Sequence, residues 1–260
     1  MASRSHSRPR VVIIGNGGAP TAGPFQPPVS SVGLSRFIDR SDVVIRMNDL
    51  NNLGAPGIGN RTDILAVNNS GLPGRRHAQG MRIAAPILRG LREILIPVPR
   101  SEIALWAADP GDDPARVYDW SAGILAHQGW GALAVSWIGD SVTAALTADL
   151  VRRAGRACLP STGVRVIAYV LSEPRFREHD RYLIDFHCVG GWEGHAWAAE
   201  RGYIESQIAA GRLRTVPRSR LGLALPRRLD HALARALWPE QRRPSGHAIR
   251  ASLAPTSALR

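Results

Sequence analysis

The stretch Val11-Val12-Ile13-Ile14-Gly15-Asn16-Gly17-Gly18 decides the fold that we expect. Its first four residues form a continuous β-branched run, which is typical of a strand buried on both faces of a parallel sheet. The glycines predict a tight turn after that strand, where backbone N–H groups can meet a phosphate. The order Gly-Asn-Gly-Gly-Ala-Pro lacks the third glycine of a dinucleotide fingerprint, so a purely structural turn explains it about as well. The chain has no lysine, which excludes a Walker-type loop.

Short apolar runs alternate with helical patterns along the chain, which favours an α/β fold with a mainly parallel sheet. We predict strands at 11–14, 43–45, 64–67, 94–98 and 182–186, and a strand or a helix at 164–171. Helices are expected at 140–155 and 195–210, with Gly155 and Gly211 ending them, and a surface helix at 225–237. Loops rich in Gly, Pro and Asn are expected at 15–28, 51–60 and 68–74, at strand ends where ligands bind in open α/β sheets.

The formal charge of +12 comes from 33 basic residues, all of them arginine, against 21 acidic ones. Residues 1–10 carry +3 and residues 212–260 carry +9, whereas residues 11–211 hold 19 charges of each sign. The basic C-terminal end favours contact with acidic surfaces. Nucleic-acid binding is disfavoured, because the neutral body shows no groove of interleaved aromatic and basic residues.

The apolar runs and the cysteines indicate the cellular compartment of the protein. No run approaches the ~18 apolar residues of a transmembrane helix, and residues 1–10 lack the apolar stretch of a secretory signal. Cys158 and Cys188 are too few for a disulfide scaffold, so we expect free thiols in a reducing compartment. We therefore expect a cytoplasmic bacterial protein without an integral membrane segment, with peripheral association at a membrane surface as a variant.

A longer pattern after the first strand resembles a known enzyme family. Phe37-Ile38-Asp39-Arg40-Ser41-Asp42-Val43-Val44-Ile45-Arg46-Met47-Asn48 is followed by Gly57-Ile58-Gly59-Asn60-Arg61-Thr62-Asp63. Together with the opening strand and its glycine turn, this resembles the large sialyl motif of the sialyltransferases of glycosyltransferase family 29. The order and spacing match over about residues 11–67.

Two shorter motifs of that family follow in the same order. Leu159-Pro160-Ser161-Thr162-Gly163 is similar to the centre of the small sialyl motif, and His195-Ala196-Trp197-Ala198-Ala199-Glu200 is similar to the H-x4-E motif. We therefore divide the chain into a basic segment at 1–10, a sialyltransferase-like domain at 11–216 and an arginine-rich extension at 217–260. The resemblance implies a Rossmann-like single α/β domain, a GT-A-like sialyltransferase variant whose mainly parallel central sheet is flanked by helices.

The resemblance also implies a reaction. Members of the family transfer sialic acid from a CMP-sugar to a glycan hydroxyl, with inversion and without a metal. For this chain it implies a short bacterial enzyme that uses CMP-sialic acid, or a related acidic sugar such as Kdo, as donor substrate and a glycan as acceptor. No separate cofactor is implied. The implied donor contacts are Asn16, Gly17, Asn48, Ser161, Thr162 and Gly163.

His195 is the implied general base. An inverting displacement needs a group that takes the proton of the acceptor hydroxyl, and imidazole titrates in the useful range. A position at a helix N-terminus would keep this imidazole neutral. Glu200 is expected to support it through a hydrogen bond or ion pair, with stabilisation of an oxocarbenium-like state as the other interpretation. No metal site is predicted, because the chain has no Asp-x-Asp and no zinc-type spacing.

Two departures from the family leave other functions open. Neither sialyl motif holds the cysteine of the animal members, and the histidine of the family's third motif has no clear counterpart. The main alternative is a CMP- or nucleotide-binding accessory protein with a degenerate sialyltransferase fold and no transfer activity. A third interpretation makes the basic tail primary, as a nucleic-acid binder whose affinity falls steeply with salt.

Overall fold

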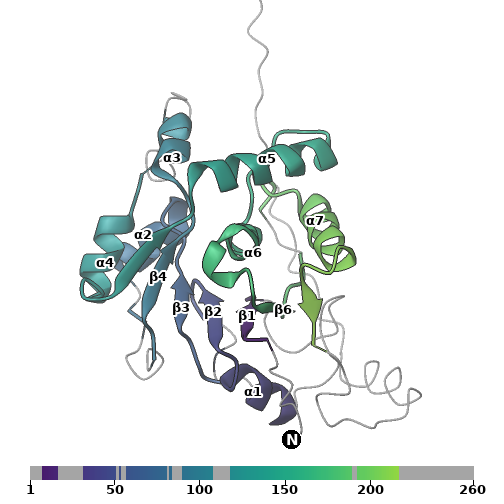
Figure 1. Ribbon diagram of the computed structural model, residues 1–260. Coiled ribbons are helices and arrows are strands. Elements are labelled where there is room, and N and C mark those ends of the chain that lie inside the picture. Colours follow the sequence, from purple (N-terminus) through teal and green to yellow (C-terminus); the bar gives the residue numbers. More distant parts are fainter. Residues whose placement is uncertain are drawn as a thin grey trace, which may run out of the picture. The chain divides into compact units, whose positions relative to one another are not determined.

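Strand β1 (Arg10–Ile14) lies inside a parallel sheet, as its apolar run predicts. It pairs with β2 (Val43–Met47) on one side and with β6 (Asp180–Ile184) on the other. Within the described residues of this computed structural model, the sheet has seven strands in the order β5-β4-β3-β2-β1-β6-β7, and all its pairs are parallel (Figure 1). The remaining strands are β3 (Ile64–Ala66), β4 (Glu93–Ile96), β5 (Ala134–Trp137) and β7 (Arg214–Thr215), of which β5 and β7 form the edges.

The structure describes residues 8–16, 32–50, 53, 57–80, 82–83, 90–107, 118–188 and 192–216. They belong to the first of two units, Met1–Leu223, and the second unit, Ala224–Arg260, lies outside them. The predicted surface helix at 225–237 and the whole extension at 217–260 therefore fall outside the described residues. The division at residues 10 and 216 stays a prediction.

Seven α-helices and one 3-10 helix connect the strands within the described ranges. They are α1 (Val32–Asp39), α2 (Gly71–Gln79), α3 (Arg100–Ala107), α4 (Ser121–Gln128), α5 (Asp140–Ala154), α6 (Thr162–Ser172), the 3-10 turn Pro174–Phe176 and α7 (Trp197–Ala209).

Alternate residues of β1 face opposite sides of the sheet, because side chains alternate along a strand. Val11 and Ile13 pack with residues of α6 and α7 on one face. Val12 and Ile14 pack with residues of α1 on the other face. Both faces are therefore covered, which explains why the strand is apolar throughout.

The predicted Rossmann-like α/β domain, with a mainly parallel sheet flanked by helices, is confirmed for the described residues. All five predicted strands are present, as are the helices ending at Gly155 and near Gly211. The segment at 164–171 is helical, because Ser161 caps α6 by accepting a hydrogen bond from the Val164 N–H. The loop predicted at 68–74 is wrong in part, since α2 begins at Gly71.

The strand order reverses between β1 and β6, so their carboxyl ends form the switch point of the sheet. Open α/β sheets bind ligands at this kind of position. Among the described residues, four other than glycine have positive φ, and they follow the two strands that flank β1: Asn48 and Leu50 after β2, and Asp185 and Cys188 after β6. Backbone strain of this kind concentrates at functional sites.

Candidate functional site

Ser161 and Glu200 form a hydrogen-bonded pair that joins α6 to α7. The Ser161 N–H donates to Glu200 Oε1 at 2.7 Å, and the Ser161 hydroxyl donates to Oε2 at 2.6 Å. Glu200 is only 2% exposed, and this burial raises the pKa of its carboxyl group although the hydrogen bonds from Ser161 act in the opposite direction. The structure therefore brings the second and third predicted motifs together.

His195 is held in one tautomer by the backbone. Its Nδ1 lies 2.7 Å from the Leu159 carbonyl oxygen, so Nδ1 carries the proton and Nε2 keeps a lone pair. Burial lowers the pKa of His195, and the positive charge of Arg165 adds to this effect. Helix α7 begins at Trp197, so His195 precedes the first helical turn. The predicted neutral imidazole therefore owes its state mainly to burial.

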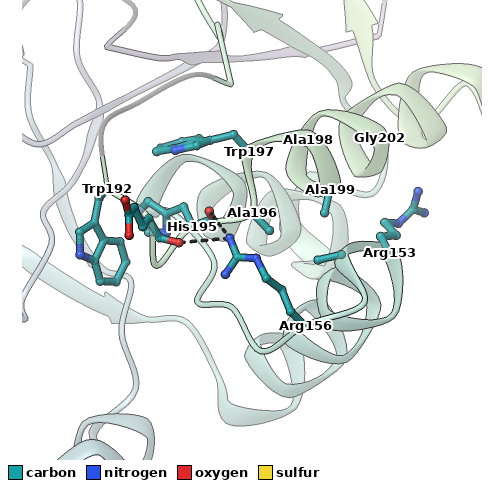
Figure 2. Close-up of a pocket in the computed structure, with 11 residues that line it drawn as sticks. Arg153, Arg156, Trp192, His195, Ala196, Trp197, Ala198, Ala199 and Gly202 are labelled. Atoms are coloured by element: carbon teal, nitrogen blue, oxygen red, sulfur yellow. Dashed lines mark hydrogen bonds between the residues drawn. The ribbon is translucent and has the colours of Figure 1, made fainter. Parts of the chain in front are cut away.

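A cavity of about 970 Å³ opens beside His195, between the end of α5 and the start of α7. The indoles of Trp192 and Trp197 stand edge-on to the imidazole, with ring centroids 4.4 Å and 4.8 Å away. Arg156 donates hydrogen bonds to the carbonyl oxygens of Glu193 and His195, as the dashed lines in Figure 2 show. We call this space the His195 cavity. Its walls combine two aromatic rings, a neutral imidazole and guanidinium groups.

The two predicted asparagines lie at the carboxyl ends of neighbouring strands, Asn16 after β1 and Asn48 after β2. Asn16 Nδ2 donates to the Met47 carbonyl oxygen at 2.8 Å. Asn48 has a φ of 49°, and its Oδ1 accepts a hydrogen bond from the Asn68 N–H at 2.9 Å. Both amides thus secure the backbone between neighbouring strand ends. Within the described residues, no hydrogen bond joins either asparagine to His195 or Glu200.

Gly163 connects the start of α6 to these strand ends. A Cβ atom at Gly163 would lie 2.8 Å from a ring carbon of Phe186 and 3.7 Å from the sulfur of Met47. Only glycine lets the helix approach this closely. Thr162 is the first residue of α6 and is half-buried, whereas Gly17 lies outside the described residues.

Sequence reasoning missed a buried ion pair behind the site. Arg165 of α6 is 2% exposed, and its two terminal nitrogens contact the carboxylate of Glu102 in α3 at 2.6 and 2.8 Å. Arg165 Nε also donates to the Pro160 carbonyl oxygen, which fixes the segment before Ser161. The sequence did contain a signal for this pair: Arg165 is a charged residue inside the apolar run 164–171, and a buried charge requires a partner.

The charged residues of the first long motif hold their own loop together. The Arg46 guanidinium donates to the carbonyl oxygens of Ile58, Gly59 and Arg61. The Asp39 carboxylate accepts the N–H groups of Asn60 and Arg61. Burial lowers the pKa of Arg46 to about 10, so the group still carries its charge at neutral pH. These contacts give the motif a structural role.

The described part of the chain holds no group of three or more His, Cys, Asp or Glu side chains that could bind a metal ion. Cys158 and Cys188 are both free and buried. No helix in the described ranges is long and apolar enough to cross a membrane.

The structure thus defines an α/β protein with a parallel sheet, a hydrogen-bonded Ser161–Glu200 pair and a polar cavity beside His195. Its sequence is 32% identical over 210 residues to the "Urease operon 23 kDa accessory protein" of Rhizobium meliloti (strain 1021), a match that covers 78% of this chain and 91% of the relative. The chain belongs to the family of that accessory protein. No protein-family model matches the sequence.

Among solved structures, the chain is similar to a mammalian sialyltransferase in complex with Gal-beta-1-3GalNAc-ortho-nitrophenol. The sequence identity is 16% with a TM-score of 0.43, and the match covers 80% of this chain and 69% of that one. A second structure of a mammalian sialyltransferase is 15% identical with a TM-score of 0.44, and the match covers 80% and 68% of the two chains. Similarity at this level does not indicate a shared activity.

The predicted membership of glycosyltransferase family 29 is wrong, and so is the predicted transfer of sialic acid or Kdo from a CMP-sugar. The relationship to the urease operon accessory protein overturns both. The physical reason lies in the residues that carried the resemblance. Asp39, Arg46 and Arg61 bind backbone groups of their own loop, and Ser161 and Glu200 bind each other. A shared fold can preserve such contacts without sharing an activity.

Proposed function

We propose that this chain is an accessory protein of urease. The relationship to the Rhizobium meliloti accessory protein, which spans most of both chains, is the observation that carries the proposal. Because the match extends over 210 residues and 91% of the relative, we extend the role in its name to this chain.

We further propose that the His195 cavity is where the protein meets its partner. Trp192 is 47% exposed, and exposed tryptophans next to arginines are the residue types that dominate binding energy at protein interfaces. Trp197 Nε1 is buried and has no hydrogen-bond partner within the described residues, so it can donate to an incoming carbonyl or carboxylate. His195 Nε2 supplies an acceptor in the same space. The proposed role of His195 is to accept a hydrogen bond or a proton from the segment of the partner that occupies the cavity.

The experiment is deletion of the gene in its own host, followed by measurement of ammonia release from urea in cell extracts. We expect urease activity to fall on deletion and to return with the wild-type gene. Trp192→Ala and His195→Ala should restore it poorly. Arg152→Gln is the matched control, because Arg152 is an exposed residue of α5 that does not line the cavity. Unchanged urease activity in the deletion strain would overturn the proposal.

We retain two further proposals from the sequence. The free thiols of Cys158 and Cys188 suit the reducing conditions of the cytoplasm, where we place the protein. The arginine-rich extension at 217–260 gives the chain a basic segment for acidic surfaces. Removal of this extension should weaken retention on a cation-exchange resin and leave the fold of residues 11–216 intact, which circular dichroism would check.

A further inference from the structure

A second cavity, of about 480 Å³, lies between α5, α6 and α7. Of the described residues, Arg153 is the one that lines both this cavity and the His195 cavity. The volume of the second cavity falls in the range of small-molecule sites. Apolar side chains from two helices form one part of the wall, among them Leu146 of α5 and Leu171 of α6. Polar side chains of α7 and the residues after it form the other part. We call this space the α5–α7 cavity.

Gln207 of α7 brings an unused acceptor to this wall. Gln207 is 5% exposed, and its Oε1 atom is buried with no hydrogen-bond partner in the described part of the chain. The Ser206 hydroxyl donates to the Tyr203 carbonyl oxygen at 2.6 Å, so it can only accept from Gln207 Nε2 at 3.4 Å. This fixes the amide orientation and leaves Oε1 as the free atom. A buried acceptor without a donor destabilises the fold, and a donor on a bound ligand removes that penalty.

The charges around the cavity favour an anion. Arg212 lines it and makes no side-chain hydrogen bond to any of the described residues, whereas Arg153 is already paired with Asp149 at 2.8 Å. Arg152 also contacts Asp149, so this carboxylate is more than neutralised. Burial raises the pKa of Tyr203, which therefore remains a neutral hydroxyl at the same wall. The net local charge is positive.

We propose that the α5–α7 cavity binds a small amphipathic anion that carries an N–H or O–H donor. The apolar body packs on the Leu146 and Leu171 side, the donor bonds Gln207 Oε1, and the carboxylate, sulfonate or phosphate pairs with Arg212. The proposal does not rest on a role with urease, because its residues and its assay are separate from those of the His195 cavity.

The test is a fluorescence titration of the full chain with 6-(p-toluidino)-2-naphthalenesulfonate, which joins an apolar body, a sulfonate and one N–H. We expect saturable binding of one probe per chain. Arg212→Gln should weaken it at least about tenfold, because it removes a hydrogen bond to a charged group. Ala145→Trp should weaken it at least as much, since Ala145 is exposed and lines the cavity, so the indole fills the space without entering the core.

Two comparisons locate the probe and test the donor. Arg75→Gln, which removes one exposed charge of α2, and Trp192→Ala should leave the affinity unchanged, because neither residue lines this cavity. Gln207→Leu should weaken binding of the probe about fivefold. It should leave unchanged the affinity of 2-naphthalenesulfonate, which has no N–H, as measured by its competition with the probe. Equal probe affinity in the wild type, Arg212→Gln and Ala145→Trp would overturn the proposal, as would the absence of saturable binding. Circular dichroism of each variant confirms that it is folded.

Discussion

Replacement of Gly15 by alanine tests the close approach of the strands at the switch point. A Cβ atom at Gly15 would lie 2.3 Å from the carbonyl oxygen of Asp185, whereas real Cβ atoms essentially never approach another atom closer than 3.0 Å. The two strand ends must therefore separate by at least 0.7 Å. The Gly15 N–H also donates to the Ile184 carbonyl oxygen at 2.9 Å, so the separation strains the ladder. Over-packing of this kind costs about 1–3 kcal/mol, and we expect about 3 kcal/mol because the clash is with backbone.

Gly202→Ala is the matched control. Gly202 lies within α7, and a Cβ there would meet Arg153 Nη1 at an ordinary 3.6 Å. Alanine should therefore stabilise the helix by about 0.5–1 kcal/mol. Urea unfolding followed by tryptophan fluorescence measures both variants against the wild type. A steric clash at Gly15 is refuted if the free energy of unfolding of Gly15→Ala lies within about 1 kcal/mol of the wild-type value, or if both variants change stability in the same direction.

Three further predictions concern the residues behind the site. Glu102→Gln should destabilise the chain by about 3–5 kcal/mol in urea unfolding, because it leaves the buried Arg165 charge unpaired, whereas Arg165→Met combined with Glu102→Leu should cost much less. Ser161→Ala should cost about 2–3 kcal/mol by thermal unfolding, since it removes a helix cap and one hydrogen bond to Glu200. Because burial raises the pKa of Glu200, stability should fall as pH rises from the ordinary glutamate range through the raised value, and Glu200→Gln should flatten this part of the profile.

The sheet could be predicted from the sequence where burial is complete on both faces. Strands such as 11–14 and 43–45 are continuous apolar runs, because each contacts helices or loops above and below. Strand β5 escaped prediction, since it lies at the edge of the sheet and none of its four residues is fully buried. An edge strand needs no apolar run, so its sequence carries little signal.

Helix α2 escaped prediction for a different reason. Its first turn, which begins at Gly71, contains two glycines and a proline, and these residues are typical of a loop. A Cβ at Gly74 would lie 2.8 Å from the backbone of Asn69 and 3.0 Å from Trp120, so glycine permits the close packing of this helix. Tertiary contact overrides the local preference here, and no local pattern reveals it.

The motifs singled out Ser161 and Glu200, but neither their direct contact nor either cavity could be predicted. The two residues are 39 positions apart, and no local pattern indicates the hydrogen bonds that join them. The cavities form between helices, so their lining depends on how α5 packs against α7, which no single segment encodes. Gln207 carries no motif signal at all, because its importance comes from an acceptor left unpaired by the fold.

The motifs also explain why a correct fold led to a wrong function. A pattern such as Asp39, Arg46 and Arg61 is constrained by the backbone groups that these side chains satisfy, and those groups exist wherever this loop exists. Buried polar groups must be paired whatever the protein does, so the pattern reports the architecture. The residues free to differ between functions are those that line open space, such as Trp192 beside His195 and Arg212 beside Gln207. Function in this chain is therefore best tested at those positions, where a substitution changes what the protein can bind and leaves the sheet unchanged.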